Sequence, residues 1–90
     1  DGSIFVGSDT ILAKYDNSGN QLWYKRLTYN TGAYDQKILP INHLIVTDDG
    51  SIFVGSDTIL AKYDNSGNQL WYKMLTYNDQ ILQINQLVIK

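Results

Sequence analysis

Residues 1–25 read DGSIFVGSDTILAKYDNSGNQLWYK, and residues 49–73 repeat them letter for letter, 48 positions further along the chain. Whatever structure one copy adopts, the other copy is expected to adopt as well. Self-similarity at a period of about 20–50 residues is typical of stacked or radial repeat architectures. The chain of 90 residues therefore predicts two copies of one supersecondary unit.

Within each copy, short runs rich in β-branched and aromatic residues alternate with clusters of turn residues. Apolar residues recur at a spacing of two, which favours β-strands over helices. Asp16–Asn20 is typical of a hairpin turn, in which Asp16 starts the turn and Gly19 takes the left-handed conformation. Asp64–Asn68 repeats it. Strands are predicted at Ser3–Gly7, Thr10–Tyr15 and Gln21–Leu27, and again at Ser51–Gly55, Thr58–Tyr63 and Gln69–Leu75.

A fourth apolar run follows each copy. Ile38–Thr47 (ILPINHLIVT) predicts a strand that begins at Ile41, because Pro40 cannot donate to a ladder. Ile81–Lys90 (ILQINQLVIK) matches it and predicts the equivalent strand. The polar, Tyr- and Asn-rich segments before these runs, Thr28–Lys37 and Thr76–Gln80, are expected to be loops.

Four strands per period are typical of a β-propeller blade. The pattern from the Asp-Gly turn through Lys-Tyr-Asp and Gly-Asn to the Trp resembles the bacterial β-propeller repeat family, with seven-bladed-propeller-type repeats. Ser18–Trp23 and Ser66–Trp71 also look like the tryptophan-docking blades of quinoproteins. The resemblance implies an all-β fold of four-stranded antiparallel blades. It places the inner strand just before the Asp-Gly turn, and Trp23 and Trp71 in the packing between blades.

The phase of the repeat divides the chain into three parts. Residues 1–37 form three outer strands of a first blade with an exit loop, residues 38–78 form a complete second blade, and residues 79–90 form an inner strand without its own blade. Two blades cannot close a ring, since propellers have about four to eight. We therefore expect a homo-oligomer of three or four chains, in which the terminal strand of one chain completes the first blade of the next. The residues expected to take part are Ile84, Leu87, Val88 and Ile89 on the terminal strand, and Ile4 and Val6 on the open edge.

Two functions of different classes fit this architecture. The first is a non-enzymatic, self-assembling β-propeller scaffold. The alternative is a multivalent carbohydrate-binding (lectin-like) module, because Tyr, Asn and Asp together can bind sugars by stacking and hydrogen bonding, and repetition raises avidity. Its candidate ligand-binding residues are Tyr29, Asn30, Tyr77 and Asn78. An ordinary polar loop is the other interpretation of these segments.

The composition argues against catalysis and cofactors. There is no Glu, no Cys and a lone His43, which leaves no nucleophilic triad, no zinc ligand set and no calcium loop with a distal Glu. In a propeller, His43 would line the channel. We expect no enzyme activity, no cofactor and no metal.

The charges and the hydropathy indicate whether nucleic acid or a membrane is a partner. The seven Lys and Arg are scattered, which argues against nucleic acid, and no apolar run approaches the roughly 18 residues of a membrane span. The chain begins inside a repeat without an initiator Met, so we expect a piece of a longer protein or an engineered sequence.

Overall fold

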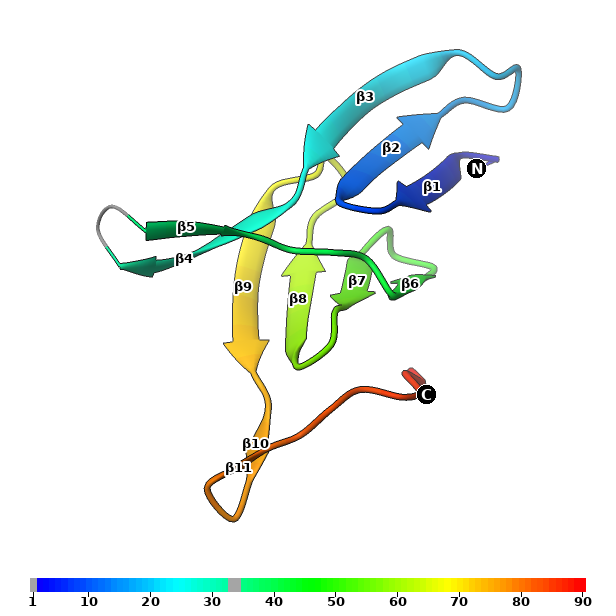
Figure 1. Ribbon diagram of the computed structural model, residues 1–90. Coiled ribbons are helices and arrows are strands. Elements are labelled where there is room, and N and C mark those ends of the chain that lie inside the picture. The colour runs from blue at the N-terminus through cyan, green and yellow to red at the C-terminus, as the bar shows by residue number, and fades with distance from the viewer. Residues whose placement is uncertain (1, 33–34) are drawn as a thin grey trace. The chain divides into compact units, whose positions relative to one another are not determined.

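Figure 1 shows the computed structural model of the chain, which describes residues 2–32 and 35–90. Asp1 of the predicted first turn, and Ala33 and Tyr34 of the predicted loop, lie outside the described residues. The described residues form antiparallel sheets and no helix, so the predicted all-β class is confirmed. In particular, the structure described has no helix that could cross a membrane. The chain divides into two compact units, Asp1–Pro40 and Ile41–Lys90.

Eleven strands run through the described part of the chain. The first unit contains β1 (Ile4–Ser8), β2 (Ile11–Tyr15), β3 (Gln21–Arg26), β4 (Thr28–Gly32) and β5 (Asp35–Ile38). The second contains β6 (His43–Val46), β7 (Ile52–Gly55), β8 (Ile59–Tyr63), β9 (Gln69–Met74), β10 (Thr76–Tyr77) and β11 (Gln80–Ile81).

The first unit is built on a three-stranded meander in the order β1-β2-β3. Val6 stands opposite Ala13 and Ala13 opposite Tyr24, so these three side chains share one face of the sheet. A register shift between Lys14 and Tyr15 leads into the turn at Asp16. The three predicted strands are therefore confirmed.

The described residues of the segment predicted as a polar loop, Thr28–Lys37, instead form two antiparallel strands. Strand β4 pairs with β5, with Thr28 opposite Ile38 and Tyr29 opposite Lys37. At the base of this pair the N–H of Leu39 donates to the carbonyl oxygen of Leu27 at 2.9 Å, and both leucines are buried. The loop prediction was wrong because the two strands carry polar residues on both faces and show no apolar alternation.

The second unit contains a four-stranded meander in the order β6-β7-β8-β9 (Figure 1). Leu44 of β6 stands opposite Val54 of β7, and Ala61 of β8 stands opposite both Val54 and Tyr72. The four strands predicted from the repeat are present. Their core lies on the face that buries Ile52, Val54, Ile59, Ala61 and Tyr63.

The predicted loop Thr76–Gln80 is also a hairpin, formed by β10 and β11. Its two central residues, Asn78 and Asp79, have φ angles of 47° and 61°. Two consecutive residues with positive φ are typical of a type I′ turn, whose strongest sequence signal is Asn-Gly. The loop prediction was wrong here because Asp79 stands where that signal has Gly.

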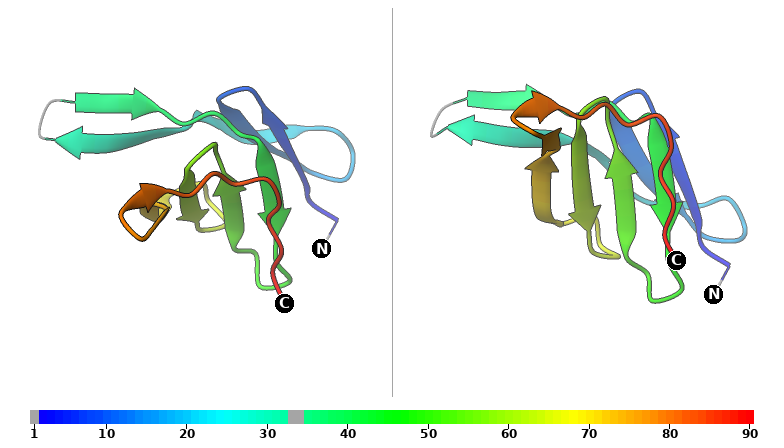
Figure 2. Two further views of the ribbon diagram at one scale, coloured as in Figure 1. Left: turned by 60° about the horizontal axis from the view of Figure 1, so that its bottom comes forward. Right: turned by 90° about the horizontal axis from the view of Figure 1, so that it is seen from below.

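The C-terminal segment Leu82–Lys90 forms no ladder within this chain. Figure 2 shows it running back along the four-stranded sheet from β11. The N–H of Leu82 donates to the carbonyl oxygen of Leu75 at 2.9 Å, and the N–H of Ile84 donates to that of Asp57 at 2.7 Å. The pairing of this segment with a second copy stays a prediction.

Candidate functional site

The open edge of β1 differs in burial from the equivalent part of β7 in the other copy. Ile4 is 47 % exposed, whereas the equivalent Ile52 is fully buried; Val6 is 43 % exposed, whereas Val54 is fully buried. The sequences are identical over this stretch. The difference in burial therefore comes from the neighbours of each strand and not from the residues themselves.

The neighbours of the two strands explain part of this difference. β7 lies between β6 and β8, whereas β1 pairs with β2 alone among the described strands. An edge strand presents backbone N–H and C=O groups along its open side and is a template for a further strand. In the first unit this open edge carries two exposed β-branched side chains, Ile4 and Val6.

The turns that close the outer hairpins are identical in both units. Oδ1 of Asp16 accepts hydrogen bonds from the N–H groups of Ser18 and Asn20, both at 2.9 Å. Gly19 takes the left-handed conformation with φ of 90°. These bonds, the side-chain bond from Asn20 first, lower the pKa of Asp16. The predicted turn is confirmed, and the Asp16 carboxylate is engaged in it.

The three-stranded and the four-stranded meander each carry a lysine–aromatic cluster that the sequence analysis did not identify. Phe53 and Trp71 pack edge to face with their centroids 6.5 Å apart, and Lys62 Nζ lies 5.4 Å above the Phe53 ring. Phe5, Trp23 and Lys14 repeat this arrangement in the first unit. Strand alternation combined with the hairpin register could have revealed these clusters. That the tryptophans pack between blades stays a prediction.

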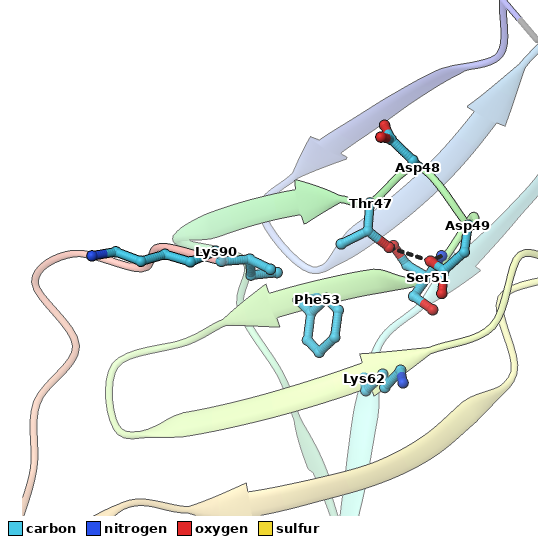
Figure 3. A pocket seen from close by; sticks show the side chains of 8 residues that line it. Thr47, Asp48, Asp49, Ser51, Phe53, Lys62 and Lys90 are labelled. Carbon is cyan, nitrogen blue, oxygen red and sulfur yellow. Dashed lines mark hydrogen bonds between the residues drawn. The ribbon is translucent and has the colours of Figure 1, made fainter.

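A pocket of about 410 Å³ opens on the second unit (Figure 3). At one end Thr47 Oγ1 and the Ser51 N–H both donate to Asp49 Oδ1, and this lowers the pKa of Asp49, with the Thr47 bond as the main cause. Phe53, Lys62 and two residues of the C-terminal segment, Ile89 and Lys90, line the rest. Oδ1 of Asp49 thus holds the turn at this end of the pocket.

The four candidate sugar-binding residues lie in two separate hairpins. Tyr29 and Asn30 are consecutive on β4, so their side chains point to opposite faces of that hairpin. Tyr77 is exposed on β10, and Asn78 occupies the following turn. The structure therefore separates the side chains of Tyr29 and Asn30 on two faces of one hairpin, and it places Tyr77 and Asn78 next to each other in another hairpin.

His43 and the acidic residues are dispersed. His43 is half-buried on β6, opposite Gly55. Across residues 2–32 and 35–90, no three His, Cys or carboxylate side chains gather in a way that could hold a metal ion.

Comparison with protein-family models and with curated proteins finds no match to this chain. The open edge of β1, together with the C-terminal segment that has no strand partner, is the feature with the clearest physical consequence.

Proposed function

We propose that the chain is a non-enzymatic scaffold unit that assembles head to tail into a closed homo-oligomeric ring, a β-propeller of three or four chains. The contrast between exposed Ile4 and buried Ile52 carries the proposal. The strand of Ile52, β7, has β6 beside it, whereas the strand of Ile4, β1, has no strand in that position among the described residues. A second copy supplies the missing strand from its C-terminal segment.

The pairing of β6 with β7 is the template for the pairing between chains. Leu44 stands opposite Val54, and Val46 stands opposite Ile52. In the repeat, Leu87 and Ile89 take the places of Leu44 and Val46. Transferring the register sets Leu87 opposite Val6 and Ile89 opposite Ile4 of the next chain. These pairs bring apolar side chains together and cover the two exposed residues of β1.

The turn after β7 supports the same register. Asn42 Nδ2 donates to Asp57 Oδ1 at 3.5 Å, just before β6 begins. The counterparts of these two residues are Asn85 and Asp9. The proposed pairing places Asn85 of one chain at Asp9 of the next, so a polar contact accompanies the apolar ones.

Carbohydrate binding is a second candidate, supported by the exposed ring of Tyr77 beside the β10–β11 turn. An exposed aromatic ring can stack on a sugar face, and a ring of chains would repeat such a site. Binding to a glycan array above background, lost in Tyr77→Ala, would support it; no binding would remove it.

Light scattering after size exclusion tests the scaffold. The intact chain should elute at three or four times 10.2 kDa. Deleting residues 85–90 should reduce the mass to that of one chain, while the hydrogen bonds of Leu82 and Ile84 remain. Leu70→Lys is the control, because Leu70 is exposed. Leu70 and its counterpart Leu22 are both 53 % exposed, so the exposure of this position is the same in the two units. A single-chain mass for the intact protein would overturn the proposal.

A further inference from the structure

The strand register divides each sheet into two faces. The valine face carries Val6, Ala13 and Tyr24 in the first unit, and Val54, Ala61 and Tyr72 in the second. The tryptophan face carries Phe5, Leu12, Lys14 and Trp23 in the first unit, and Phe53, Leu60, Lys62 and Trp71 in the second.

The valine face is more deeply buried in the second unit than in the first, although Ala13 and Ala61 at its centre are buried in both. Val54 is fully buried and Val6 is exposed. Tyr72 is 37 % exposed, whereas its counterpart Tyr24 is 64 % exposed. The first unit therefore leaves exposed part of a face that is more deeply buried in the second unit, where the sequence is identical.

Burial of the tryptophan face follows the opposite order. Leu12 in the first unit is fully buried, whereas its counterpart Leu60 is half-buried. Trp23 is half-buried and Trp71 is exposed. Each unit thus leaves more accessible the face whose counterpart is more deeply buried in the other unit.

The C-terminal segment lies on the tryptophan face of the second unit. A methyl group added at Gly55, which is on this face, would lie 3.4 Å from Cδ2 of Leu87, so Leu87 lies directly over Gly55. Ile89 lines the pocket together with Phe53 and Lys62 of the same face. In the register of the proposed function, Leu87 and Ile89 belong to the valine face of the sheet that they complete.

We propose that the valine face of the first unit of one chain packs on the tryptophan face of the second unit of another chain, with Leu87 and Ile89 between them. This inference rests on the proposed assembly and identifies its second contact surface. The surface is heterologous, because the two faces differ, and therefore each chain uses both. The pocket beside Phe53 lies at this contact and is closed by the second chain.

Two variants, each blocking one face away from the β1 edge, test the contact. Tyr24→Lys places a charge on the valine face at β3, and Leu60→Lys places one on the tryptophan face at β8. Trp71→Lys is a second variant of the tryptophan face, since its exposed side chain makes unfolding less of a risk. Circular dichroism checks that each variant is folded, and Leu70→Lys is the control.

Each variant alone should elute as a single chain of 10.2 kDa. An equimolar mixture of Tyr24→Lys with either tryptophan-face variant should give a species of two chains and nothing larger, because one intact contact remains. If these variants keep the mass of the intact oligomer while deletion of residues 85–90 abolishes it, strand pairing stands and the face contact is wrong. A two-chain species formed by one variant alone would also overturn the heterologous contact.

Discussion

The backbone N–H of Ile84 donates to the carbonyl oxygen of Asp57 at 2.7 Å, which fixes the C-terminal segment at the turn between β7 and β8. In the first copy Asp9, the counterpart of Asp57, takes a positive φ of 54°. Asp57 does not. Identical turn sequences therefore adopt two backbone conformations.

This difference predicts opposite effects of one substitution at the two positions. Asp9→Gly should stabilise the chain by roughly 0.5–1 kcal/mol, because Gly adopts positive φ without a steric penalty. Asp57→Gly should destabilise it by a similar amount, because it only adds freedom to the unfolded chain. Urea unfolding of the chain lacking residues 85–90 measures both, and effects of the same sign would contradict the prediction.

The two isoleucines at the start of β1 and β7 give a second matched pair. Ile52→Ala should lower the free energy of unfolding by about 2–5 kcal/mol, because it removes a fully buried side chain. Ile4→Ala should cost under about 1 kcal/mol in the chain lacking residues 85–90, since Ile4 is already exposed in the full single chain. Equal costs at the two sites would show that Ile4 is buried within a single chain.

Acid should weaken the turns. The pKa values of Asp16 and Asp49 lie below their usual value, chiefly because Asn20 and Thr47 respectively donate side-chain hydrogen bonds to them. A carboxyl with a lowered pKa in the folded state stabilises above its unfolded pKa, which is about 3.9. This stability is lost as the pH falls through the folded-state pKa. The midpoint of thermal unfolding should therefore drop below about pH 4, and Asp16→Asn should reduce this dependence; an unchanged slope would contradict it.

Joining two copies covalently distinguishes three chains from four. Lys90 aligns with Thr47 and Asp1 aligns with Asp49, so one Asp inserted between Lys90 and the next Asp1 restores the spacing of the repeat. A four-chain ring can be built from two such fused chains, and its mass should stay almost unchanged. A three-chain ring cannot, and fusion should then change the mass of the assembly. Light scattering reads the result directly.

The seven strands of the two meanders were predictable because each forms from local signals. Alternating β-branched residues marked the strands, and Asp16 with Gly19 marked the turn between two of them. The two smaller hairpins were missed since β4 and β5 have no apolar face and Asn78-Asp79 lacks the usual Gly. Local signals that are polar on both faces do not separate a hairpin from a loop.

The open edge followed from the phase of the repeat, whereas the two faces could not be predicted. Leu12 and Leu60 stand in identical sequences, and so do Val6 and Val54, yet their burial differs. Burial depends on what lies beside a residue in space. A repeated sequence carries no information about which copy will be covered, so only the structure could show it.

The tight connection between β6 and β7 has a kinetic consequence. The N–H of Thr47 donates to the carbonyl oxygen of Ser51 at 2.9 Å, which closes the hairpin. Strands β1 and β7 have the same sequence, so either could pair with a β6 strand. The short connection gives β7 a high effective concentration near β6, and we expect β6 to pair with β7 faster during folding. Refolding by rapid dilution should favour the pairing of β6 with β7 of the same chain. Refolding at high protein concentration should instead let strands pair between chains and produce domain-swapped species that rearrange slowly.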